Sequence, residues 1–162
     1  MSTTIAHELT DRLRKQIGQG GGVVEVNGDG ASVAVDVEQS ERYAVGVRGI
    51  TVTPTQPVAD VRDAAERIAH GVTELDGPLT VVEYDTRQDQ AIVRSAEPEA
   101  DETGVTYWEA DVRADETTLQ RYRKDHAAPD REQITEPLLH STVGRVAEQL
   151  VDALKQPGQP DA

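Results

Sequence analysis

The chain contains no cysteine and no phenylalanine, and its aromatic residues are one tryptophan and four tyrosines among 162 residues. Without cysteine it can form neither a disulfide nor a thiolate metal site. The absence of cysteine favours no particular cellular compartment. With so few bulky aromatic residues, a core must be built from Val, Ala and Leu. By length we expect one domain, able to bury about two-thirds of its unfolded surface.

Long apolar runs are also missing. No stretch reaches the roughly 18 consecutive apolar residues that a membrane-spanning helix needs, so we expect no membrane partner. Residues 1–10 lack a basic stretch followed by an apolar one, so no secretory signal is expected. The expected location is therefore the cytoplasm.

Basic residues are scarce, with 16 against 30 acidic residues and a formal net charge of −14. Such a surface keeps a protein soluble and repels polyanions. Nucleic-acid binding needs a basic stripe that neutralises phosphates, so we expect no nucleic-acid partner. Two explanations of the acid excess stay open: adaptation to high salt, and the preference for Arg over Lys that a GC-rich genome produces.

The acidic residues are concentrated in one part of the chain. Residues 96–116 hold eight acids and a single base, Arg113, which gives a charge of −7. Within this stretch, residues 96–104 predict an exposed, mobile loop around Pro98. Mutual repulsion of these carboxylates predicts that salt stabilises the chain.

Apolar periodicity predicts a first helix over residues 3–17, with an apolar stripe every four residues at Ile5, Leu9, Leu13 and Ile17. The glycine-rich run 18–22 ends it, because glycine does not hold a helix. A second helix is predicted from Pro57 to about Val72. A third is predicted from near Thr135, with Pro137 in its first turn, to Leu154.

Alternating side chains predict strands between these helices. Three fall between the first two helices, and four fall between the second and third, at residues 79–84, 90–95, 105–113 and about 118–124. The sequence Asn27-Gly28-Asp29-Gly30 accepts positive φ and marks a hairpin. A turn at residues 28–29 places Val24 opposite Val33. Tyr43 is expected in the third strand.

These elements predict an α+β fold, a twisted antiparallel sheet of about six to seven strands with three helices in the order α-βββ-α-ββββ-α. We expect one domain over residues 1–155 and a disordered tail over 156–162. The element order, the size and the acidity resemble the type III secretion chaperone-like fold, from which the chain departs by one extra strand. The resemblance implies a small acidic homodimer whose surface holds an unfolded stretch of an effector.

The hairpin around Trp108 is the best candidate site in the sequence. Alternation places Trp108 and Tyr107 on opposite faces of strand 105–113. With a turn centred on residues 115–116, Arg123 falls opposite Trp108. Aromatic and Arg residues are favoured where partners dock, so the candidate binding residues are Tyr107, Trp108, Arg121, Tyr122 and Arg123. The alternative is that Trp108 belongs to the core and Arg123 stacks on it as a cation–π pair.

Other chemistry-bearing residues form no recognisable site. No metal site is expected, because the histidines form no HxH or HExxH pair and are expected at the solvated surface: His7, His70, His126 and His140. Glu109 and Asp111 share a strand face, but nothing in the sequence desolvates either carboxyl group. The glycine run 18–22 lacks the GK[ST] ending of a phosphate loop. We therefore expect no catalytic residue and no cofactor.

Two classes of function follow. The first is a non-enzymatic protein- or peptide-binding module, chaperone-like, whose partner the sequence does not name. The second is a small-molecule-binding or enzymatic domain that uses the face of Trp108, Arg121 and Arg123. A homodimer is also expected, through the strands around Trp108 or through the third helix, because one chain has few bulky residues to cover its apolar surfaces.

Overall fold

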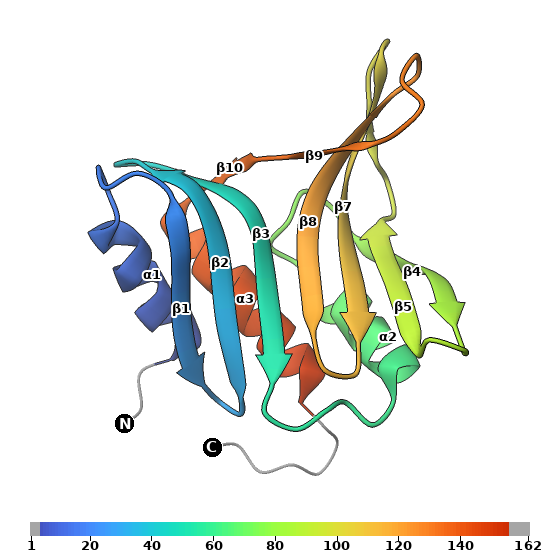
Figure 1. Cartoon of the computed structure of the whole chain (residues 1–162), viewed down its shortest axis with the longest axis horizontal. Coiled ribbons are helices and arrows are strands. Elements are labelled where there is room, and N and C mark those ends of the chain that lie inside the picture. Colours follow the sequence, from blue (N-terminus) through green and yellow to red (C-terminus); the bar gives the residue numbers. More distant parts are fainter. Residues whose placement is uncertain (1–3, 156–162) are drawn as a thin grey trace.

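A computed structural model describes residues 4–155 of the chain as an α+β fold (Figure 1). Its three helices are α1 (Ile5–Lys15), α2 (Val61–Gly71) and α3 (His140–Leu154). Its first strands are β1 (Gly22–Gly28), β2 (Ala31–Ser40) and β3 (Val45–Pro54). The later strands are β4 (Leu79–Asp85), β5 (Gln90–Ser95), β6 (Glu99–Ala100), β7 (Gly104–Arg113), β8 (Thr117–Asp125), β9 (Glu132–Ile134) and β10 (Glu136–Leu138). The predicted fold class is confirmed, while the tail at 156–162 lies outside the described residues.

The strands form one antiparallel sheet in the order β1-β2-β3-β8-β7-β5-β4. The two predicted strand blocks meet where β3 pairs with β8, over residues 50–52 and 117–119. Three short strands that the alternation did not predict complete the sheet: β6 pairs with β7, β9 with β8 and β10 with β3. The segment 132–138 thereby crosses from one block to the other (Figure 1).

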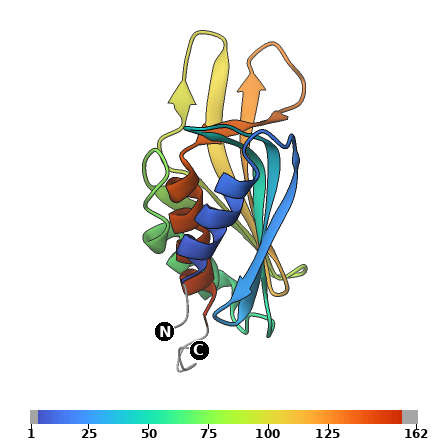
Figure 2. The ribbon, with the colours of Figure 1, turned by 90° about the vertical axis from the view of Figure 1, so that its left-hand side faces the viewer.

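All three helices pack on the same side of the sheet (Figure 2). We call this side the covered face and the opposite side the open face. The core lies between helices and covered face and is aliphatic, with fully buried side chains that include Val33, Val35, Ile50, Leu119 and Leu150. Alternation in β2 explains this burial, because every second residue, a valine at 33, 35 and 37, points to the helices.

The close packing of α1 against α3 depends on Gly144. A Cβ atom at this position would lie 2.5 Å from the carbonyl oxygen of Ala6 and 2.5 Å from the hydroxyl of Thr10. Only a glycine lets the two helix backbones approach this closely. The apolar side of α3 is fully enclosed by this arrangement.

The helix boundaries differ from the predicted ones. Helix α1 ends at Lys15, so Ile17 lies outside it and is 40 % exposed. Helix α2 begins only at Val61, because β3 continues through Pro54 and Asp60 caps the helix with its side chain. Helix α3 begins at His140 because the segment before it joins the sheet as β9 and β10.

Both predicted hairpin turns are displaced. In the first, residues 29 and 30 form the turn, with φ of 54° and 80°, so Val26 rather than Val24 faces Val33. In the second, Trp108 pairs with Arg121 and not with Arg123. Each pairing differs by two residues from the predicted one, which preserves the face of every side chain because side-chain direction has a period of two.

Two local predictions are also wrong. Tyr43 lies before β3, in a turn, and is 72 % exposed. Within the stretch 96–104, residues 96–103 are exposed, as expected, but the stretch contains β6, and the Asp101 carboxylate accepts hydrogen bonds from the backbone amides of Thr103 and Gly104. These bonds give the stretch a defined turn instead of the expected loop.

Candidate functional site

The five candidate binding residues do not form one surface. Tyr107 and Tyr122 face each other across β7 and β8 on the open face. Trp108 and Arg121 form the neighbouring pair on the covered face and are 3 % and 5 % exposed. Arg123 lies beyond the core at the end of β8. The proposed recognition surface around Trp108 is therefore wrong, and Trp108 belongs to the core.

As the alternative interpretation predicted, Trp108 lies in the core and forms a cation–π pair, but its predicted partner is wrong. The Arg121 guanidinium, and not that of Arg123, lies over the indole, at 5.2 Å from the ring centroid. Arg123 instead binds the Asp101 carboxylate at 3.1 Å, Asp125 at 2.8 Å and the Thr103 hydroxyl at 2.6 Å. The bond from Arg123, and then the bonds from Thr103 and Gly104, lower the pKa of Asp101.

Arg121 borders a small acidic pocket on the covered side of the sheet. Its Nη2 atom donates to Glu99 at 3.1 Å. Its Nε atom lies 2.9 Å from a Glu136 oxygen without hydrogen-bond alignment. Burial raises the pKa of Glu136, against the opposing effect of Arg121. The pocket has a volume of about 340 Å³ and is lined by Asp76, Ser95, Glu97, Glu99, Thr106 and Arg121. We call it the Arg121 pocket.

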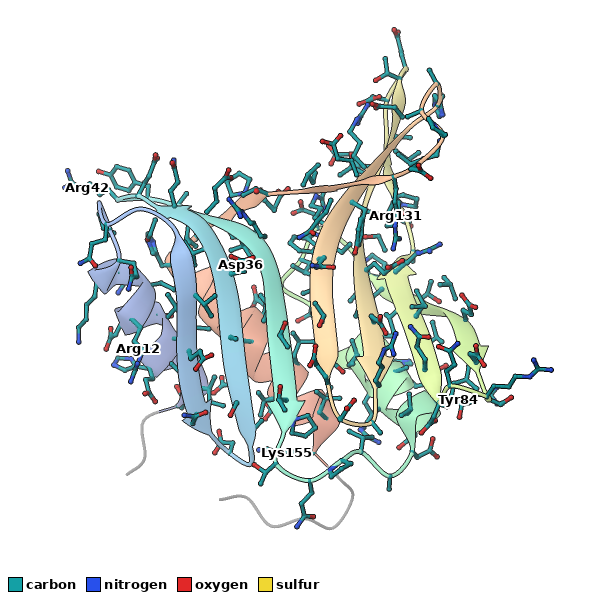
Figure 3. All side chains as sticks on the ribbon, viewed as in Figure 1. Arg12, Asp36, Arg42, Tyr84, Arg131 and Lys155 are labelled. Atoms are coloured by element: carbon teal, nitrogen blue, oxygen red, sulfur yellow. The ribbon has the colours of Figure 1, made fainter. Side chains whose placement is uncertain are left out.

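The open face carries a second group of charged and aromatic residues around Glu109. We call it the open-face cluster, and its members come from β5, β7, β8 and the segment before β9: Arg94, Tyr107, Glu109, Tyr122 and Arg131. Strand pairing sets Arg94 directly opposite Glu109 and Tyr107 opposite Tyr122. Strand β9 pairs with the end of β8 and so brings Arg131 to β7 and β8 (Figure 3).

Glu109 is the centre of this cluster. Arg131 holds its carboxylate with two hydrogen bonds, at 2.8 and 2.9 Å, and Arg94 donates a third at 2.6 Å. The residue is 5 % exposed although it lies on the face without helices. Burial acts to raise the pKa of Glu109, but the bonds from Arg131 and Arg94 outweigh burial and lower it.

The two tyrosine rings are held in place by the same arginines. The ring centroids of Tyr107 and Tyr122 lie 6.1 Å apart. The Arg131 guanidinium stacks on Tyr122 at 3.8 Å, and the Arg94 guanidinium lies 5.4 Å from the Tyr107 centroid. Both arginine side chains keep solvent contact, with 42 % of Arg94 and 36 % of Arg131 exposed. The result is a patch of planar groups anchored on a buried carboxylate.

Sequence reasoning identified the two tyrosines of this cluster and missed its other members. Glu109 was considered, but the groups that bury it could not be identified, because the sequence does not show that β5, which carries Arg94, pairs with β7. Arg131 falls in a stretch with no periodicity. The one available signal was the gathering of basic residues after position 120, which did not specify their contacts.

The expected exposure of the histidines is wrong for His140, which is 5 % exposed. Its Nε2 atom lies 3.1 Å from the Ser40 hydroxyl, which donates its own proton to the Leu13 carbonyl oxygen at 2.9 Å. The Ser40 oxygen can then accept a hydrogen bond from Nε2 in the tautomer that carries the ring proton there. Burial, and then Arg14, lowers the pKa of His140. Because both side chains are enclosed, this pair joins α1, β2 and α3 and is not placed to attack a substrate.

His, Asp and Glu are the potential metal ligands among residues 4–155. No group of three or more His, Asp or Glu side chains there is arranged to hold a metal ion. No helix in the same range is long and apolar enough to cross a membrane. The one desolvated carboxyl group of the open-face cluster, Glu109, is held ionised by two arginines, which suits it to anchoring rather than to proton transfer.

Comparisons of the chain with known protein families, with curated proteins and with solved structures found no match. The resemblance to secretion chaperones therefore stays a prediction. Function is inferred from the geometry of the chain itself.

Proposed function

We propose that the chain is a non-enzymatic, chaperone-like module that holds an extended segment of a partner protein on its open-face cluster, in the cytoplasm. The observation that carries the proposal is the anchoring of Arg94, Tyr107, Tyr122 and Arg131 around buried Glu109, on the face that the helices leave uncovered.

Two physical arguments support binding at this cluster. Tyr and Arg are among the residue types that contribute most to protein interfaces. Groups already fixed by hydrogen bonds and stacking lose little conformational entropy on binding, so more of their contact energy becomes affinity. The guanidinium edges and ring surfaces that remain exposed offer cation–π and hydrogen-bonding contacts to a peptide.

The second class of function uses the Arg121 pocket. Its volume of about 340 Å³ lies at the small end of ligand sites, and its lining holds three carboxylates beside one guanidinium. A small cationic molecule fits this chemistry. The two classes differ in which residues a ligand contacts, since the Arg121 pocket and the open-face cluster lie on opposite faces of the sheet.

The test begins with peptides selected from a random display library against the folded chain. Their affinities are then measured by calorimetry for Tyr122→Ala and Arg94→Ala, after thermal melts confirm that both variants fold. The matched controls are Tyr43→Ala and Arg48→Ala, an exposed tyrosine and an exposed arginine elsewhere. We expect the cluster variants to weaken binding about tenfold or more, as interface hot spots do, and the controls less than about twofold. Equal losses in both sets would contradict the proposal.

The expected homodimer stays a prediction. Trp108 is buried, and so is the apolar side of α3. The exposed large hydrophobic residues of the described chain lie on five separate segments: Ile17, Val23, Tyr43, Val82 and Leu139. No part of the proposed function requires a second copy. Light scattering coupled to size exclusion measures the mass directly, with 17.6 kDa as the monomer value.

A further inference from the structure

The two outer strands of the sheet differ in how well their edges are protected. Strand β4 has a register shift between Val81 and Glu83, and such bulges discourage the addition of another strand. Strand β1 pairs with β2 over seven consecutive residues, Gly22–Gly28, without any shift. It contains no proline or lysine, and its one charged residue is Glu25. Among the described strands, only β2 pairs with β1, so its outer edge is open.

A groove runs along this edge between β1 and α1. Its volume is about 320 Å³, and we call it the edge groove after its lining residues Arg12, Lys15, Gln16, Val23, Val24 and Glu25. Figure 2 shows β1 and α1 side by side at this end of the molecule, and Figure 3 places Arg12 on the helix. Val23 is 61 % exposed, which is unusual for a valine in a strand of this sheet.

The helix side of the edge groove is basic in a chain whose net charge is −14. Arg12 pairs with Glu8 at 3.3 Å, but the Arg12 side chain is exposed and Glu8 only half-buried, so this pair is weak. The Lys15 ammonium group makes no ion pair with another described residue. Glu25 is the one acid of the lining, but its alternation with buried Val24 and Val26 turns its side chain to the open face, so Arg12 and Lys15 determine the charge on the helix side of the groove.

A second copy of the chain is a poor occupant of this edge. Antiparallel pairing of β1 with itself about its central residue would set the two Glu25 carboxylates opposite each other, which is destabilising. It would also bring together two helices that each carry Arg12 and Lys15. A partner strand with the opposite charge pattern meets neither repulsion.

We propose that β1 is a strand-addition site for an extended acidic peptide segment. The segment pairs with β1 through its backbone, and its alternate side chains point toward α1 or toward the open face. The side chains directed to α1 are Asp or Glu and meet Arg12 and Lys15. The others are small apolar or polar residues beside Val23. This site is separate from the open-face cluster and does not depend on the function proposed for it.

The test uses a short synthetic peptide in which Glu alternates with Val and Thr. The same peptide with Lys in place of Glu is the charge control, and a version N-methylated at alternate residues blocks backbone pairing without changing the protein. We expect the acidic peptide to bind and to slow hydrogen exchange of β1 amides but not of β4 amides. The two control peptides should leave exchange unchanged.

The charge requirement is tested with the double variant Arg12→Glu/Lys15→Glu. The matched control, Arg48→Glu/Arg87→Glu, changes net charge equally at exposed positions away from the edge groove. We expect about a tenfold weaker Kd for the first and less than a twofold change for the second. Melting temperatures establish that both variants fold.

Several outcomes would overturn the proposal. The acidic peptide could fail to bind at its highest soluble concentration, or both double variants could lose affinity for it equally. The peptide could also slow hydrogen exchange of the β4 amides instead of the β1 amides. If the β1 amides exchanged more slowly at higher protein concentration in the absence of peptide, self-pairing would be favoured and the proposal would also be overturned. Loss of acidic-peptide binding in Tyr122→Ala, with β1 exchange unchanged, would assign the peptide to the open-face cluster.

Discussion

Replacing Arg131 with alanine should destabilise the fold by about 2–3 kcal/mol. The substitution removes two charge-assisted hydrogen bonds to Glu109, at 2.8 and 2.9 Å, and bonds of this kind are worth about 1.5–3 kcal/mol each. The Arg94 bond at 2.6 Å remains, and Arg131 is 36 % exposed, so water can replace part of what is lost. The cost is therefore below the roughly 3–5 kcal/mol of a fully buried pair.

Thermal and urea denaturation measure this effect. For a chain of this size, about 2–3 kcal/mol corresponds to a fall in Tm of about 5–10 °C. The matched control is Arg113→Ala, because Arg113 pairs with Asp111 at 3.3 Å with both side chains exposed, and such pairs contribute less than about 1 kcal/mol.

A double-mutant cycle with Glu109→Gln separates the ion pair from other effects of the alanine. In the Glu109→Gln background, Arg131→Ala should cost about 1 kcal/mol less, since the partner charge is gone. The lowered pKa of Glu109 adds a second readout. The stabilisation that ionised Glu109 contributes is present above its ordinary pKa of 4.5 and is lost as pH falls through its lowered pKa in the folded chain. Glu109→Gln should therefore reduce the fall in stability at acid pH. Equal costs of Arg131→Ala in both backgrounds would refute the reasoning.

Three further outcomes are expected. Gly144→Ala should lower the free energy of unfolding by at least about 2 kcal/mol in chemical denaturation, because the new Cβ would clash with the α1 backbone. The control Gly71→Ala should not destabilise the fold, because a Cβ at that position meets nothing within 4 Å. Stability should fall as pH drops below 6.5, because His140 takes up a proton in the unfolded chain but, with its lowered pKa, not yet in the folded chain. A series of melts in which His140→Gln shows the same slope of stability against pH as the unchanged chain would disprove this. Sodium chloride should raise Tm through screening of the net charge of −14, and a flat or falling Tm would remove the repulsion argument.

Local signals in the sequence predicted the elements of the fold and their faces. Alternating valines identified β2, and residues 27–30 identified its hairpin with β1. Their exact pairing could not be read in the same way, because a shift of two residues leaves every side chain on the same face. The turn was decided by Asp29 and Gly30, which both adopt positive φ.

Contacts between distant segments were not predictable. Residues 132–138 carry Pro137 and lead into a helix, so they resembled a helix start, yet pairing with β8 and β3 makes them strands. The open-face cluster depends on the same kind of contact. Arg94 and Arg131 reach Glu109 only because β5 pairs with β7 and β9 pairs with β8. The sequence therefore indicated Tyr107 and Tyr122 as candidates but not the carboxylate that anchors them.

Amide NMR titration with a library-selected peptide tests the central claim most directly, because it maps contact on both faces of the sheet at once. If the open-face cluster binds the partner, the largest shifts should fall on Arg94, Tyr107 and Tyr122 and on the segment around Arg131. Shifts centred instead on Asp76, Glu97 and Glu99, which line the Arg121 pocket, would contradict the account and favour a ligand site on the covered face.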